Sequence, residues 1–212
     1  NWDSNAVPDV GDEVTVPAGA TILLAAPTAN LGAFTMNGGI LVFTNWGTRL
    51  QAQNIALQGG TVTLPTAYRI DQMSNRVWFV AATNFTLVSG AVIDASAGGY
   101  MTSNGVGAGR SYYNDKTDGG GGGHAGYGGR GINDSSVPGG PYGSLTEPNS
   151  PGSGGGGLYP NGGFGGGVGR IEAGNAATVD GTIQANGRSA TAFAGAAVNR
   201  VICMLECMFC PA

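Results

Sequence analysis

The sequence predicts an all-β fold, a parallel β-helix or solenoid with right-handed coils and an ordered glycine-rich segment at its side. Three observations support this class. Short runs rich in Val, Ile, Thr and Leu are separated by Gly, Pro or Asn, which is the pattern of strands between turns. No stretch combines an apolar period of 3.6 residues with helix caps. A glycine-marked repeat also recurs along the chain.

Seven strands are expected in the first 96 residues, each bounded by turn-forming residues. They are residues 14–16, 21–24 (TILL), 39–44, 49–57, 60–64, 76–81 and 85–96. We expect a single solenoid domain with three parts, which are N-terminal coils at 1–97, a glycine-rich excursion at 98–169, and a C-terminal coil with a cysteine-containing tail at 170–212.

The repeat consists of an apolar residue, a polar pair, a glycine, one further residue and an apolar strand. Its copies are MNGGILV (36–42), LQGGTVT (57–63), LVSGAVI (87–93) and VDGTIQA (179–185), with their glycines at Gly39, Gly60, Gly90 and Gly181. One coil cannot bury its own apolar face and must stack on the next. The glycine is expected where the chain turns with φ > 0 or where coils approach closely. A β-sandwich would also fit seven short strands, but it does not require the repeated glycine.

The glycine-rich excursion holds about two thirds of the chain's 41 glycines and almost no strand pattern. Similar strands, AVIDASAGG (91–99) and GTIQANGRS (181–189), bracket it, so it leaves the stack and rejoins it. A loop of about 70 unstructured residues is rare in a compact domain, and we therefore expect ordered, extended, polyproline-II-like chains. The aromatic residues expected to pin it to the core are Tyr100, Tyr112, Tyr113, Tyr127, Tyr142, Tyr159 and Phe164.

The composition indicates an ordered, weakly charged, extracellular or cell-surface protein. Hydrophobic residues make up 42% of the 212 residues, and charged residues only 10%, against about 25% in average globular proteins. The net charge of −4 with scattered basic residues argues against nucleic-acid binding. No apolar run reaches the roughly 20 residues of a membrane span. The chain starts at Asn1 without Met, which suggests a processed mature chain or a trimmed fragment. Few lysines and much Asn, Thr, Ser and Gly favour a secreted protein.

Two resemblances point the same way. The stretch GDEVTVPAGATILL, with LGAFTMNGGILVF and LQAQNIALQGGTVTL, resembles the G8 module over about residues 8–64. G8 modules are glycine-punctuated all-β domains of large extracellular and cell-surface proteins. Residues 94–190 look like the glycine-rich parallel β-helix regions of large bacterial surface proteins and adhesins. Both resemblances imply an extracellular β-helix, and neither brings a catalytic residue set.

The three cysteines, Cys203, Cys207 and Cys210, all lie in the C-terminal tail. Their C-x3-C-x2-C spacing suits an iron–sulfur cluster, but that motif opens a long α/β barrel, which does not fit an all-β chain. A zinc site lacks a fourth ligand in the sequence. A disulfide between two of the three is expected instead, with the third free or bridged to a neighbouring subunit.

No cofactor is expected, and the metal candidates are weak. His124, between five glycines and AGYGG, is a candidate metal ligand or base, although a hydrogen-bonding role that ties down the glycine segment is favoured. Asp9, Asp12 and Glu13 are a candidate Ca²⁺ site, but their spacing matches no defined Ca²⁺ loop. Solvated charge on the first coil is the favoured interpretation.

The expected function is structural, without catalysis: a fibre or matrix subunit or an adhesin stalk. The expected partner is the protein itself, because the open ends of a solenoid are unpaired strand rows that join subunits end to end. Candidate assembly residues come from the TILL strand and the apolar tail, and they are Ile22, Leu23, Leu24, Val201, Ile202, Leu205 and Phe209.

The alternative is a β-helix that binds or cleaves carbohydrate, including cell-surface glycans. It predicts a groove lined by Trp2, Trp46, Trp78 or tyrosines, with acids beside it. Asp94 and Asp180 flank strands of different repeats and are candidates for a glycoside-cleaving pair. An ice- or surface-binding protein ranks third, because Thr does not form a regular T-x-T ladder.

Overall fold

The computed structural model describes residues 6–72, 75–111, 119–131, 136–144, 149–157 and 161–190, together with the backbone of 204–207. All regular secondary structure in these residues is β-strand, and they contain no helix. The predicted all-β class is therefore confirmed.

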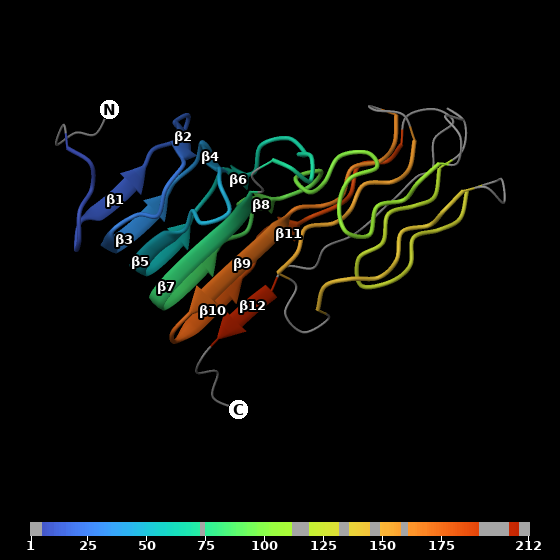
Figure 1. The fold of residues 1–212 in the computed structure, drawn as a ribbon. Helices are drawn as coiled ribbons and strands as arrows, with labels where there is room; N and C mark the ends of the chain where they lie inside the picture. Colours follow the sequence, from blue (N-terminus) through green and yellow to red (C-terminus); the bar gives the residue numbers. More distant parts are fainter. Residues whose placement is uncertain are drawn as a thin grey trace.

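The strands form two sheets in which every neighbouring pair is parallel (Figure 1). The first sheet contains β1 (Glu13–Val16), β3 (Asn30–Met36), β5 (Leu50–Leu57), β7 (Arg76–Leu87), β9 (Val168–Ala173), β10 (Ala176–Val179) and β12 (Met204–Cys207). Its order is β1-β3-β5-β7-β9-β12, with β10 also paired to β7. The second sheet contains β2 (Thr21–Leu24), β4 (Ile40–Phe43), β6 (Thr61–Thr63), β8 (Val92–Asp94) and β11 (Thr182–Gln184), in the order β11-β8-β6-β4-β2.

From β1 to β8 the chain alternates between the two sheets, and each return adds one strand to the same edge. The register is continuous across these returns. In the first sheet one row joins Val14, Phe34, Ile55 and Phe85. In the second sheet one row joins Ile22, Leu41, Val62, Ile93 and Ile183. Equivalent apolar side chains of successive chain turns therefore lie beside one another.

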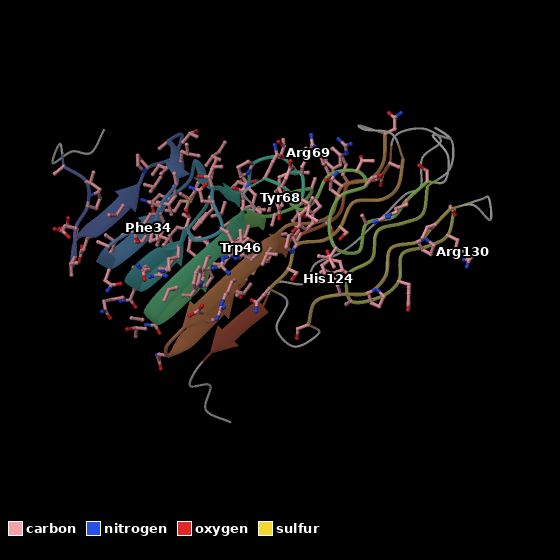
Figure 2. All side chains as sticks on the ribbon, viewed as in Figure 1. Phe34, Trp46, Tyr68, Arg69, His124 and Arg130 are labelled. Carbon is pink, nitrogen blue, oxygen red and sulfur yellow. The ribbon has the colours of Figure 1, made fainter. Side chains whose placement is uncertain are left out.

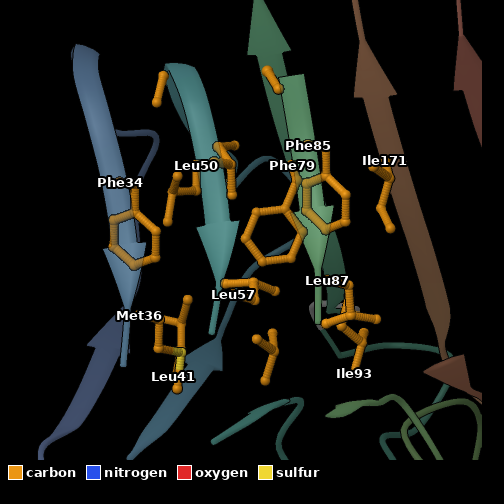
Figure 3. Packing of buried hydrophobic residues seen from close by; sticks show 14 of the residues in the cluster. Phe34, Met36, Leu41, Leu50, Leu57, Phe79, Phe85, Leu87, Ile93 and Ile171 are labelled. Atoms are coloured by element: carbon orange, nitrogen blue, oxygen red, sulfur yellow. The ribbon is translucent and has the colours of Figure 1, made fainter. Parts of the chain in front are cut away.

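The hydrophobic core lies between the two sheets (Figure 3). Strand side chains alternate between faces, so every second residue of β1, β4 and β9 is buried. Phe79 is fully buried and packs edge-on against Phe43 at 5.2 Å between ring centroids, and against Phe85 at 5.5 Å. Aromatic pairs of this geometry add to the stabilisation from apolar burial.

The repeat glycines take the backbone roles expected of them. Gly39, Gly60 and Gly90 have φ angles of 79°, 81° and 91°, in the left-handed region that disfavours residues with a Cβ atom. At Gly181 the reason is the close approach of two chain turns, because a Cβ there would lie 2.5 Å from the carbonyl oxygen of Ala91. The prediction of a corner or a close approach at each copy is confirmed.

Most predicted strand limits differ from the observed ones by about one residue, and two regions differ more. Residues 30–36 form β3, although Asn30 and Gly32 weaken its β signal. The run predicted at 85–96 is divided: its first residues continue 76–81 into one long strand at 76–87, because Thr83 and Asn84 do not form a turn, and its later residues form β8 in the second sheet. The Asn84 side chain instead donates to Asn54 Oδ1 at 3.1 Å and accepts from Asn175 at 3.0 Å, so asparagines of three chain turns are linked.

The described parts of 98–167 extend beside the sheets as long extended segments that fold back on one another, without forming regular β-strands (Figure 1). Their backbone hydrogen bonds reach several neighbours at once. Within residues 119–123, Gly120 donates to Arg110 and accepts from Gly156, while Gly121 donates to Gly129 and accepts from Gly139. This bonding in several directions resembles packed polyproline-II-like chains more than a sheet ladder.

Close approach explains the glycine content of this segment. Gly139 is buried, and a Cβ atom on it would lie 1.9 Å from the carbonyl oxygen of Gly107. Of the aromatic residues expected to pin the segment, Tyr100 packs edge-on against Tyr68 at 5.0 Å and Phe164 is buried. Tyr127 is 79% exposed, so its predicted anchoring role is wrong. Tyr112, Tyr113 and Tyr159 lie outside the described residues.

Candidate functional site

His124 lies inside the glycine-rich segment, away from the two sheets (Figure 2). It is 6% exposed, its Nε2 lies 2.8 Å from the carbonyl oxygen of Ser150, and its ring packs edge-on against Tyr142 at 4.8 Å. Tyr142 in turn donates to the carbonyl of Pro151 and accepts from Ser153 Oγ. Burial raises the pKa of Tyr142 to about 12, although its bond with Ser153 opposes this. These contacts join separate glycine-rich runs and match the tying role expected of His124.

The acidic candidates near the N-terminus cap a turn. Asp12 Oδ2 accepts from the backbone N–H of Asp9 at 2.8 Å, and Asp9 Oδ1 accepts from the N–H of Val10 at 2.7 Å. Glu13 begins β1 and is exposed. Among the described residues, no group of three His, Cys, Asp or Glu side chains is placed to hold a metal ion.

Most of the tail candidates lie outside the described residues, namely Cys203, Cys210, Val201, Ile202 and Phe209. Trp2 also lies outside them. Leu205 and Cys207 belong to β12, whose backbone pairs in parallel with β9 so that Leu205 is opposite Ile171. The predicted disulfide and tail contacts therefore stay predictions.

The TILL strand forms the edge of the second sheet. Ile22 and Leu24 are partly buried against the core, whereas Leu23 is 65% exposed. Strand β12 forms the edge of the first sheet, at the opposite end of the strand order. The register aligns β1 with β10, because both share the rows of Asn84–Leu87, whereas β12 is aligned with β9. An end-to-end stack would thus place β10 of one copy beside β1 of the next, and β11 beside β2. The expected contact between the tail and TILL does not follow from this topology.

The two acids considered for glycoside cleavage are not register partners. Asp94 is opposite Thr63 and Gln184, whereas Asp180 precedes β11 and lies four residues before Gln184. Burial raises the pKa of Asp94, but hydrogen bonds from the side chain and backbone of Ser96 and from Gln184 outweigh it, and the net pKa is lowered. A carboxyl group with a lowered pKa is a poor general acid at neutral pH.

The outer face of the first sheet carries a cluster that the sequence did not reveal. We call it the arginine–tryptophan face, and its members are Trp46, Arg49, Arg76, Trp78, Arg170 and Glu172. The strand members of this face alternate with Leu50, Val77, Phe79 and Ile171, which are buried in the core. Trp46 instead lies in the turn between β4 and β5 and packs partly against the small core cluster of Ala95, Val168 and Ala185. The register places Trp78 opposite Arg170, and Leu50 opposite Phe79, so Arg49 lies next to Trp78.

Trp78 is the centre of this face. The guanidinium carbon of Arg76 lies 4.0 Å from its ring centroid, and those of Arg49 and Arg170 lie 5.4 Å from it. Its indole N–H donates to Glu172 Oε1 at 2.8 Å, and the same oxygen lies 2.6 Å from Arg170 Nε. Three cations thus surround one aromatic ring, with one carboxylate among them.

Arg76 is the most deeply placed of the three arginines. It is 9% exposed, it lies 4.7 Å from the Trp46 ring centroid, and its Nε donates to the Trp46 carbonyl oxygen at 2.8 Å. Burial lowers the pKa of Arg76, and the neighbouring Arg170 and Arg49 lower it further, while Glu172 opposes them. Among the described side chains, this face thus carries three arginines and one carboxylate, Glu172.

Sequence reasoning named Trp46 and Trp78 as carbohydrate candidates but treated the arginines as scattered. Arg49, Arg76 and Arg170 are separated by up to 121 positions in the chain, and only the strand register brings them together. The available signal was that Arg49 and Arg76 each come directly before an apolar residue at the start of a predicted strand.

Comparison with known proteins gives one family match. No curated protein and no solved structure matches the chain. No helix in the described residues is long and apolar enough to cross a membrane. The resemblance of residues 94–190 to bacterial surface proteins stays a prediction. The model of the G8 domain matches residues 1–85, a longer range than expected, and the chain therefore carries a G8 domain that spans β1 to β6 and most of β7.

Proposed function

We propose that this chain is a β-solenoid that serves as a non-catalytic structural module of an extracellular or cell-surface protein, and that it assembles end to end into fibres or stalks. The strand order carries this proposal. Every second strand from β1 to β8 adds in parallel to the same growing edge, which is how the coils of a solenoid stack. The glycine corners repeat with the same period as the coils.

The ends of such a stack favour assembly in one direction. In the described residues β1 and β2 lie at one end of the two sheets, and β12 and β11 lie at the other. The strand pairings within both sheets are parallel, so a second copy placed head to tail continues both ladders without reversing a strand. A contact of this kind is heterologous and does not close, which produces filaments.

Assembly can be tested through the unpaired backbone groups on the edge of β2. The carbonyl oxygens of Ala20 and Leu24 accept from Ile40 and Thr44 of the neighbouring turn. Backbone groups alternate in direction along a parallel strand, so the N–H of Leu23 points to the open side of the sheet. Proline at this position removes an N–H that the intrachain ladder does not use, and proline is tolerated on edge strands.

The experiment compares the wild-type chain with Leu23→Pro, Leu23→Thr and a deletion of 198–212, which removes β12. Sedimentation velocity and negative-stain electron microscopy measure assembly, and circular dichroism checks the fold. We expect filaments from the wild type and from Leu23→Thr, which keeps the N–H, and short or no filaments from Leu23→Pro and from the deletion. A wild type that stays monomeric at high concentration, or a folded Leu23→Pro that polymerises equally well, overturns the proposal.

A further inference from the structure

We propose that the arginine–tryptophan face is a binding site for an anionic polysaccharide, in which Arg49 and Arg170 contact carboxylate or sulfate groups of an extended glycan and the buried Arg76 adds positive charge beneath them. This inference goes beyond the structural role proposed above and does not depend on end-to-end assembly.

The first argument is charge. Three guanidinium groups lie within 5.4 Å of the Trp78 ring centroid, and among the described side chains Glu172 is the carboxylate that contacts them. Glu172 is already used by the Trp78 N–H and by Arg170. Like charges held together in a partly buried place are unfavourable unless an anion compensates them. A bound anion would offset the net positive charge of the face.

The second argument is preorganisation. Arg76 is fixed by the Trp46 carbonyl oxygen, and Arg49 Nε donates to Gln51 Oε1 at 2.8 Å. Stacking on Trp46 and Trp78 further fixes the guanidinium plane of Arg76. Each arginine is thus held at its Nε end, so less side-chain entropy is lost when a ligand binds. Guanidinium groups bind carboxylates and sulfates through paired N–H donors, so the site should select for oxyanions of this geometry.

The third argument is spacing. Arg49, Trp78 and Arg170 stand next to one another on β5, β7 and β9 or just before them. Neighbouring strands lie about 4.8 Å apart, so Arg49 and Arg170 are separated by roughly 10 Å. A sugar unit in an extended glycan has a length similar to one strand spacing, so acidic groups on alternate units suit the two outer arginines. Nucleic acid fits less well, because it requires a longer basic surface than this chain of net charge −4 provides.

The experiment measures binding of the full chain to immobilised dextran sulfate, polyguluronate and neutral dextran, with a single-stranded DNA oligonucleotide as a further probe. Dextran sulfate and polyguluronate separate the sulfate and carboxylate sources of the anion. We expect binding to at least one of them, no binding to neutral dextran, and weaker binding as the salt concentration rises.

The variants locate the site. Arg49→Gln and Arg170→Gln each lower affinity by about tenfold or more, as expected for a charged hydrogen bond. Glu172→Gln removes the internal competitor and raises affinity several-fold. Arg69→Gln and Arg130→Gln are matched controls, because both arginines are exposed, carry the same charge and lie apart from Trp46 (Figure 2). Circular dichroism confirms that every variant is folded.

Three results overturn the proposal. The first is that neither polyanion binds the wild type. The second is that Arg69→Gln and Arg130→Gln weaken binding as much as Arg49→Gln, which would show a general charge effect. The third is that the DNA oligonucleotide binds more tightly than both polysaccharides, which would assign the face to another class of partner.

Discussion

The glycine-rich segment makes a sharp prediction through two adjacent residues, Gly139 and Gly140. Gly139 is buried, and an added Cβ would lie 1.9 Å from Gly107 O and 2.6 Å from Gly123 N. Gly140 is exposed, and an added Cβ would meet nothing within 4 Å. Neither has a positive φ, so the steric environment alone distinguishes them. We predict that Gly139→Ala destabilises the segment and that Gly140→Ala does not.

The magnitude follows from the contacts. Overpacking a dense interior costs about 1–3 kcal/mol. Gly139 also donates to Gly121 O at 2.8 Å and accepts from Gly128 N at 2.9 Å, and a shifted backbone would lose about 1 kcal/mol for each bond. The reduced entropy of the unfolded chain returns about 0.4–1 kcal/mol. We expect Gly139→Ala to lower the free energy of unfolding by about 2–4 kcal/mol and Gly140→Ala to leave it unchanged or slightly raised.

Urea unfolding monitored by far-ultraviolet circular dichroism gives the two free energies of unfolding. Hydrogen exchange with mass spectrometry then shows whether the loss of protection is confined to the described runs of 98–169. Equal stability of the two alanine variants would refute the reasoning, because it would mean that the close backbone approach at Gly139 does not exist.

Three further predictions concern other parts of the molecule. Phe79→Ala removes the fully buried ring that packs on Phe43 and Phe85, and thermal or urea unfolding should show a decrease of about 3–5 kcal/mol in the free energy of unfolding. A decrease below about 1 kcal/mol would contradict the packing of Phe79 in the core. Asn84→Ala breaks the links to Asn54 and Asn175 and should cost about 1–2 kcal/mol in urea unfolding, whereas Gln53→Ala, an exposed neighbour of Asn54, should cost little. The folded structure raises the pKa of Tyr142 from 10.0 to about 12, so the free energy of unfolding keeps the contribution of Tyr142 below about pH 10 and loses it between about pH 10 and 12. Urea unfolding of Tyr142→Phe at several pH values should lack this part of the pH dependence.

The fold was predictable from the sequence where a residue type has one dominant physical preference. TILL at 21–24 matches β2 because its β-branched and aliphatic residues lie between turn signals. Gly39, Gly60 and Gly90 marked the corners because a positive φ favours glycine. Strand β3 was missed because Gly32 is needed for close approach to the preceding turn, where a Cβ would lie 2.5 Å from Gly11 O, and this requirement is invisible in the sequence.

The candidate site was only half predictable for a similar reason. Trp46 and Trp78 stand out as rare aromatic residues, and His124 stands out as the single histidine. The arginines that surround Trp78 lie far apart in the sequence. They come close to one another only through the strand register, which cannot be read from a single sequence. Asp94 and Asp180 illustrate the opposite error, because similar local sequence suggested a pair that the register separates.

The in-register stacking of successive chain turns is tested most directly by one distance. Thr21 and Thr182 are exposed and stand in the same row of the second sheet, joined through Ile40, Thr61 and Val92. Four strand spacings of about 4.8 Å place their Cα atoms roughly 19 Å apart. Spin labels at these two positions, with the three cysteines replaced by serine, should give a narrow double electron–electron resonance distribution near that distance. A broad distribution, or one centred beyond about 30 Å, would contradict the stacked arrangement.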